Sequence, residues 1–160
     1  MAALAQLFDG ALAELKTYRG ADLLPRFRAA APLDLFGFDS EVLGGRGDLV
    51  QSQLHGELAR RRVYVHTHRW TSLGLSLLEA MHLGIPVVAL ATTEVPRAVP
   101  DGCGFVSNDV EELVEAVRLL IADPDRARAV GRLGRREVRR RYGLERFLDD
   151  WDRVLKEVAA

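Results

Sequence analysis

Hydrophobic and polar positions along the 160-residue chain follow two periodicities, that of a strand and that of a helix. Short runs of apolar or alternating residues predict strands at 33–38, 63–67, 85–91 and 105–107. Apolar residues at helical spacing predict helices at 3–17, 21–30, 49–60, 73–83, 110–122, 123–142 and 144–158. Because strands and helices take turns through the middle of the chain, the pattern predicts an α/β fold: a Rossmann-like parallel sheet with helices on both faces.

These elements are expected to form one domain over residues 1–160, since a chain of this length suits one compact core. Residues 1–18 form an N-terminal helical segment in this interpretation, and 109–158 form a helical C-terminal cover. Asn108 or Asp109 can cap the first helix of that cover. In parallel sheets the ligand crevice lies beyond the carboxyl ends of the strands, which directs attention to the loops that follow them.

Charge and composition exclude several classes of protein. Lys and Arg number 22 and Asp and Glu number 23, so the net charge of −1 disfavours a nucleic-acid binder that relies on bulk positive charge. Cys103 is the single cysteine, which excludes an internal disulfide and disfavours a cysteine metal site. The apolar run 85–91 is too short to span a membrane, and Asp9 and Glu14 interrupt the N-terminus where a signal peptide would be apolar. We therefore expect a cytoplasmic location.

One carboxylate stands out in the middle of the chain. Between Trp70 and Thr93 the single charged residue is Glu79, in the helix predicted at 73–83. A carboxylate in an apolar helix is costly unless something hydrogen-bonds it, and ligand hydroxyls would do so. Just upstream, Gly74 lets a ligand approach the backbone, and free amides at a helix N-terminus favour phosphate. Together these features indicate a nucleotide site; the alternative is that Gly74 is a turn residue and Glu79 pairs with a surface arginine.

Residues 72–90 (SLGLSLLEAMHLGIPVVAL) resemble the nucleotide-sugar signature of retaining glycosyltransferases of the GT-B fold, the glycosyl transferases group 1 family. The likeness continues in DGCGFV at 101–106, in LLIADP at 119–124 and in the closing helices with Phe147 and Trp151. It covers about residues 60–158, which would be the C-terminal, nucleotide-sugar-binding domain of such an enzyme. The segment around Arg19 and Gly20 is similar to a basic-glycine segment of the family.

The resemblance implies a role for several residues. Glu79 would contact the ribose hydroxyls of the nucleotide, and the backbone of Ser72, Leu73, Gly74 and Leu75 would touch the donor sugar and diphosphate. Arg19 would neutralise the diphosphate.

The sequence departs from the family pattern at three positions near the expected site. Thr71 stands where a glutamate contacts the donor sugar, and we take Thr71 and Arg19 as the catalytic candidates. Arg97 replaces a glutamate after the following strand and could offset leaving-group charge. Glu14 replaces an arginine of the diphosphate clamp.

Histidines cluster after the strand at 63–67. His66 and His68 could both face one side as metal ligands, but no third ligand is evident, and the resemblance implies a metal-independent enzyme without a cofactor. His68 is instead a candidate for contact with sugar or phosphate, or a structural histidine. Trp70 could line the donor pocket or simply pack. His82, three residues after Glu79, could be the partner of that carboxylate.

The sequence thus predicts the donor domain of a hexosyltransferase-type glycosyltransferase that transfers a sugar from a nucleotide-diphosphate sugar with retention. Family members have a second, acceptor-binding N-terminal domain, so we expect such a domain or a partner subunit, and incomplete activity for this chain alone. Two alternatives stay open: a nucleotide-binding module without transfer activity, and a flavodoxin-like scaffold domain without a nucleotide site. Neither nucleic acid nor an integral membrane segment is expected.

Overall fold

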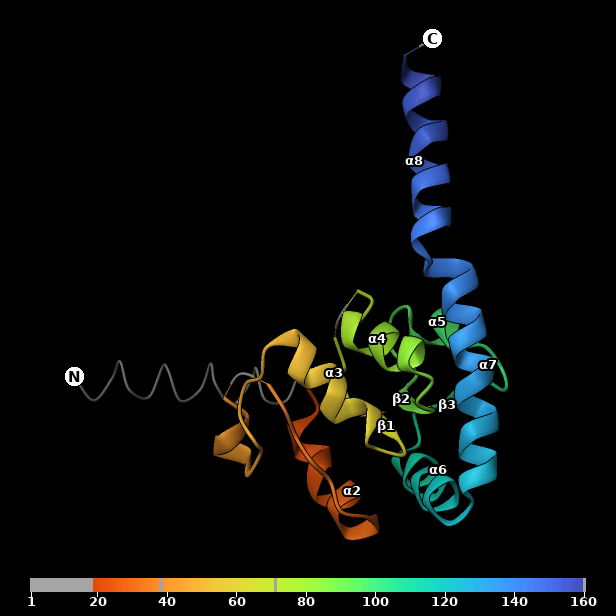
Figure 1. Ribbon diagram of the computed structural model, residues 1–160. Coiled ribbons are helices and arrows are strands. Elements are labelled where there is room, and N and C mark those ends of the chain that lie inside the picture. Colours follow the sequence, from red (N-terminus) through yellow and green to blue (C-terminus); the bar gives the residue numbers. More distant parts are fainter. Residues whose placement is uncertain (1–18, 38, 71, 160) are drawn as a thin grey trace, which may run out of the picture.

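A parallel sheet of three short strands organises the part of the chain that the structure describes. The computed structural model describes residues 19–37, 39–70 and 72–159. The strands β1 (Tyr64–His66), β2 (Val87–Leu90) and β3 (Gly104–Ser107) lie in the order β1-β2-β3, all parallel (Figure 1). All four residues of β2 are buried, as its continuous apolar run predicts.

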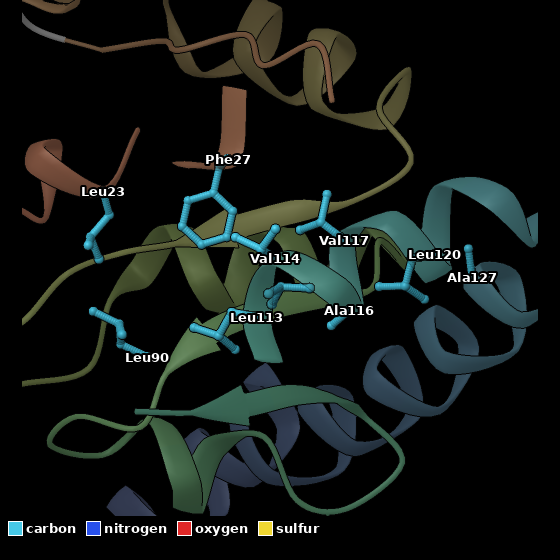
Figure 2. Packing of buried hydrophobic residues seen from close by; sticks show 10 residues of the cluster. Leu23, Phe27, Leu90, Leu113, Val114, Ala116, Val117, Leu120 and Ala127 are labelled. Carbon is cyan, nitrogen blue, oxygen red and sulfur yellow. The ribbon is translucent and has the colours of Figure 1, made fainter. Parts of the chain in front are cut away.

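Alternate residues of β2 point to opposite faces of the sheet, and each face has its own core. Val88 and Leu90 join a cluster with Phe27 from α2 (Leu24–Ala30) and with α6 (Val110–Ala122). Figure 2 shows Phe27 pointing toward Val114 in this cluster. Val87 and Ala89 join a second cluster with α4 (Leu75–Leu83), α5 (Val95–Ala98) and α7 (Pro124–Tyr142). The predicted α/β, Rossmann-like fold is confirmed.

Side-chain caps begin the two long helices that follow the sheet. The Asp109 carboxylate accepts a hydrogen bond from the Glu111 amide at 2.8 Å, at the start of α6. The Asp123 carboxylate accepts from the Arg126 amide at 2.9 Å, at the start of α7. Both caps satisfy amides that have no partner within the helix, which is why these boundaries could be predicted.

Helix α7 lies against α4 through two glycines. Gly84 ends α4 in a left-handed conformation, with φ 77°. A Cβ on Gly131 of α7 would lie 2.0 Å from the Gly84 carbonyl oxygen, so the two backbones touch directly. The absence of a side chain at position 131 therefore sets the distance between the two helices.

The strand predicted at 33–38 is wrong for its described residues, 33–37, which do not join the sheet. The Leu35 carbonyl accepts from the Arg46 amide at 2.8 Å, and the Gly37 amide donates to the Gly47 carbonyl at 2.9 Å. The segment thus pairs with the glycine-rich loop that follows it, which itself contains the 3-10 helix η2 (Ser40–Leu43).

Three further helices complete the described chain. The 3-10 helix η1 (Ala21–Leu23) precedes α2, and α3 (Gln51–Ala59) packs on α4. Helix α8 (Leu144–Val158) projects away from the sheet and its covering helices (Figure 1). Each described helix is too short or too polar to cross a membrane. The helix predicted at 3–17 lies outside the described residues.

The apolar residues of α8 form one exposed stripe. Every residue of the helix is exposed or half-buried. The large apolar side chains recur three or four residues apart, and Trp151 is 51% exposed. They are Leu144, Phe147, Leu148, Trp151, Val154, Leu155 and Val158. While α6 and α7 contribute buried residues to the two clusters, no described part of the chain covers the stripe of α8.

Candidate functional site

Two loops meet at the carboxyl end of the sheet. The loop after β1 contains His68, whose carbonyl accepts a hydrogen bond from the Thr92 hydroxyl at 2.8 Å, in the loop after β2. Thr93 is held at φ 47°, a left-handed conformation that is uncommon outside glycine. Such backbone geometry is typical of functional loops, and the loops occupy the edge at which parallel sheets bind ligands.

The basic segment at Arg19 and Gly20 packs directly on the end of β1. The Thr67 hydroxyl donates to the Arg19 carbonyl at 2.8 Å. Gly20 has φ 70°, and a Cβ there would lie 2.1 Å from the Thr67 carbonyl oxygen. Arg19 is exposed, and its positive charge is a secondary cause of the lowered pKa of His68, after burial. Arg19 and His68, both predicted as site residues, thus lie together.

The N-terminus of α4 reaches the same place. Gly74 is its N-cap, and the Gly74 carbonyl accepts from the amides of Leu77 and Leu78. The first amides of a helix have no partner within the helix and are available to an anion. Ser72 and Leu75 are exposed, whereas Leu73 packs against the second core cluster. Of the four residues at 72–75 that were expected to contact the donor, Ser72 and Leu75 are exposed and Gly74 lies at the helix end.

His66 lies directly beneath this helix end. Its side chain is 1% exposed, and a Cβ on Gly74 would lie 2.6 Å from the imidazole Cε1 atom. The His66 and His68 rings stack with centroids 4.6 Å apart. Within the described ranges, neither ring nitrogen of His66 has a hydrogen-bond partner. Burial, and to a lesser extent His68, lower the pKa of His66 to about 4, so the ring is neutral near pH 7.

Glu79 lies on α4 facing α3. Its Oε1 atom accepts a hydrogen bond from Gln51 Nε2 at 3.0 Å and lies 3.6 Å from His55 Nε2. The expectation that His82 is its partner is wrong, since α3 supplies both contacts. His82 lies near α7 instead. Burial is the main cause of its lowered pKa, and the positive charges of Arg139 and Arg135 lower it further. The Glu79 side chain is 29% exposed, and its Oε2 atom takes no hydrogen bond from the described part of the chain.

Three candidates remain: Arg97, Trp70 and Thr71. Arg97 of α5 is exposed and pairs with Glu94 at 3.2 Å. Trp70 is 75% exposed. Thr71, the catalytic candidate, lies outside the described residues. Among the residues 19–37, 39–70 and 72–159, no three His, Cys, Asp or Glu side chains are grouped as a metal site requires.

Sequence reasoning missed Gln51 and His55, the residues that hold Glu79. They lie one turn apart on α3, at 51 and 55, so the spacing shows that they share a helix face. What it cannot show is that this face packs on α4, because that depends on tertiary structure.

The family model for glycosyl transferases group 1 matches residues 46–137. The chain belongs to this family. The match begins before α3 and runs into α7, so it includes His68, Ser72, Glu79 and Arg97, while Arg19 and α8 lie outside it.

The relatives found by sequence are much longer than this chain. Over 98 residues the chain is 34% identical to sulfoquinovosyl transferase SQD2 of Arabidopsis thaliana, covering 58% of this chain and 19% of that protein. Over 112 residues it is 32% identical to alpha-maltose-1-phosphate synthase of Mycolicibacterium smegmatis, covering 64% and 29%. The chain thus spans less than a third of these relatives.

Solved structures share the fold of this group 1 chain. Sucrose-phosphate synthase of Thermosynechococcus elongatus matches with a TM-score of 0.78 and 22% identity, over 89% of this chain and 43% of that one. Anabaena Alr3699/HepE, in complex with UDP-glucose, matches with a TM-score of 0.72 and 20% identity, over 88% and 46%.

The neutral, buried His66 makes the stability of this domain depend on pH. Its pKa of about 4 lies below the ordinary value of 6.5, so the unfolded chain takes up a proton first as the pH falls. The free energy of unfolding should therefore be unaffected by this group above pH 6.5 and fall by about 3 kcal/mol between pH 6.5 and pH 4. Urea unfolding at several pH values tests this. His66→Phe should flatten the slope; an equally steep slope in that variant would assign it to other groups.

Proposed function

We propose that the chain is the donor-binding domain of a glycosyltransferase and binds a nucleotide-diphosphate sugar at the carboxyl end of β1. The observation that supports this most is the convergence there of Arg19, His68 and the N-terminus of α4, with Glu79 about one turn further along the same helix. A cation and free helix amides suit a diphosphate, and a carboxylate suits the hydroxyls of a ribose.

Each group has a distinct part in this proposal. Glu79 holds the ribose through Oε2, which is left available because Gln51 and His55 both contact Oε1. The backbone at 72–75 holds the diphosphate and the sugar. Arg19 offsets the charge that the diphosphate acquires as its bond to the sugar breaks, and Arg97 adds a more distant positive charge. Thr71 takes the position next to the donor sugar.

The transfer itself follows from stabilising the leaving group. The bond between the anomeric carbon and the diphosphate oxygen breaks with its electron pair on the oxygen. The acceptor hydroxyl then bonds to the same carbon, and its proton passes to the departing diphosphate. We infer a hexosyl transfer without a metal or organic cofactor, because Arg19 and the helix amides supply the positive potential that this step needs. Retention is proposed from the resemblance to the retaining enzymes of the family. A cytoplasmic location stays a prediction from the sequence.

Support from relatives concerns the donor. The HepE structure holds UDP-glucose in a chain of this fold, and the relatives include mannosyltransferases that depend on GDP-mannose. These statements apply to those proteins. They define the donors with which to begin testing this chain.

Calorimetric titration of the 160-residue chain with UDP, GDP and ADP tests donor binding. We expect saturable binding of at least one of them at one site per chain, and weaker binding of the corresponding nucleoside, which lacks the diphosphate. If none of the three binds, the chain is a scaffold domain of Rossmann-like fold and the proposal is wrong. A transfer assay with a form that also carries an acceptor-binding domain then separates an enzyme from a module that only binds.

An acceptor-binding N-terminal domain or a partner subunit completes the enzyme in this proposal. Two observations support it: the chain spans less than a third of the first relatives, and α8 exposes its apolar stripe to solvent. The polar face of α8 contains more acidic than basic residues, which disfavours an anionic membrane as the cover. A protein surface is the better match.

The exposed stripe gives a prediction for this chain by itself. Phe147→Lys together with Trp151→Lys should change the free energy of unfolding by less than about 1 kcal/mol, because each side chain is more than half exposed and their ring contact, 6.2 Å between centroids, is with each other within α8. Thermal melting followed by circular dichroism measures this, with Leu77→Ala in the core of α4 as the destabilised reference. A loss of several degrees in the double variant would mean that α8 is already covered in solution, by this chain or a second copy.

A further inference from the structure

His66 and His68 form a stack of two imidazoles at the proposed diphosphate site. The inner ring, His66, is 1% exposed and lies against the backbone of Gly74. The outer ring, His68, is half-buried and stacks on it at 4.6 Å between centroids. The His68 Nδ1 atom is also buried and has no partner among the described residues. A buried polar group without a partner is uncommon and calls for an explanation such as a catalytic role.

Positive charge predominates among the groups around His68. Arg19 comes from the segment before η1, and its charge opposes protonation of His68. The N-terminus of α4, with its partial positive charge, lies beyond His66. Thr92 contributes a hydroxyl to the His68 carbonyl, and the adjacent Arg69 is neutralised by Asp22, at 2.5 and 2.8 Å. Without a ligand this environment favours a neutral His68 ring.

A bound diphosphate reverses this electrostatic balance. In the proposed site its negative charges lie beside Arg19 and the helix amides, so the potential at His68 should change from positive to negative. The stack allows one added proton and not two, because a second positive charge on the buried His66, 4.6 Å away, would be strongly repelled.

Resting on the proposed function, we propose that binding of the donor's diphosphate is linked to protonation of His68, with His66 as the neutral ring behind it. The proton comes from solvent and goes to a ring nitrogen of His68. The resulting imidazolium donates a charge-assisted hydrogen bond to a diphosphate oxygen. When the glycosyl bond breaks, this group adds to Arg19 in stabilising the electron pair that the departing diphosphate retains.

Proton uptake can be measured directly. A nucleotide sugar is the correct probe, because its diphosphate is esterified at both ends and does not titrate near neutral pH, whereas the terminal phosphate of a free nucleotide does. Calorimetric titration at pH 7 in two buffers of different ionisation enthalpy gives the number of protons bound. UDP-glucose and GDP-mannose are the first probes. We expect uptake that approaches one proton per bound ligand, and an affinity that falls up to tenfold per pH unit as the pH rises.

Variants of the four histidines assign the proton. His68→Gln keeps a hydrogen-bonding side chain but cannot take up a proton, so uptake and pH dependence should both disappear. His66→Phe keeps a neutral flat ring behind His68, so uptake should persist. His55→Gln and His82→Gln should each retain uptake, whatever His55→Gln does to affinity through Glu79.

The outcomes separate this inference from the proposed function. Binding with a pH-independent affinity and no proton uptake overturns the linkage and leaves donor binding intact. Uptake that survives in His68→Gln and disappears in another histidine variant places the proton elsewhere and also overturns it. If no nucleotide sugar binds at any pH, both the inference and the proposed function fail.

Discussion

Glu79→Ala should lower the affinity for a nucleoside diphosphate by about ten- to a hundredfold and leave the fold intact. A hydrogen bond to a charged group contributes about 1.5–3 kcal/mol, which corresponds to that range. The cost to stability is small because the side chain is 29% exposed and its partners, Gln51 and His55, can turn to water when it is removed. Alanine is also the best helix former at a position within α4.

Calorimetry and thermal melting of the same samples test both halves of this expectation. Glu115→Ala is the matched control, because Glu115 is an exposed carboxylate on α6 that pairs with Arg118 three residues later. It should change neither affinity nor melting temperature appreciably. If Glu79→Ala binds nucleotide normally and melts several degrees lower, the carboxylate serves to hold α3 on α4, and the ribose contact is not made by this residue.

Gly131→Ala should destabilise the domain by about 3 kcal/mol. An added methyl group would lie 2.0 Å from the Gly84 carbonyl oxygen, which is backbone and cannot rotate away. Overpacking of this kind typically costs about 1–3 kcal/mol, and this contact is at the severe end. In a solvent-exposed helix the same substitution would stabilise by about 1 kcal/mol, because alanine favours the helical conformation more than glycine does. Here the steric clash is expected to outweigh that gain.

Gly56→Ala provides the opposite case within the same chain. Gly56 is also a helical glycine, in α3, and a Cβ there meets no atom within 4 Å. It should stabilise by about 0.5–1 kcal/mol. Urea unfolding of the two variants beside the parent chain gives both values. Equal stability of Gly131→Ala and the parent would show that α7 can move off α4 without cost.

Local signals explain which parts of the fold could be predicted. Asp109, Asp123 and Gly143 mark helix boundaries by capping or by ending a helix, so α6, α7 and α8 follow from the sequence. β2 follows from its uninterrupted apolar run. The segment at 33–37 also contains apolar residues, but Asp34 and Gly37 interrupt it. Its backbone groups pair with a loop, and no local pattern reports which partner a backbone group chooses.

The candidate site also has features that the sequence reveals and features that depend on tertiary packing. Glu79 and Gly74 stand out because a charge in an apolar helix and a glycine at a helix start are visible in one segment. The partners of Glu79 on α3 depend on how α3 packs on α4, and this packing cannot be predicted from the sequence pattern. The burial of His66 beneath Gly74 is likewise a tertiary property, although the spacing of His66 and His68 did mark the strand end as a place to examine.

Helix α4 is held by backbone contact at both of its ends. Gly74 rests on the His66 ring at one end, and Gly84 rests on Gly131 at the other. Nine residues separate these contacts, a rod of about 13 Å that carries Glu79 between them. A side chain on Gly74 or Gly131 would therefore displace α4 and move Glu79 with it. Under the proposed function, a larger residue at position 131 of α7 is therefore expected to lower donor affinity as well as stability.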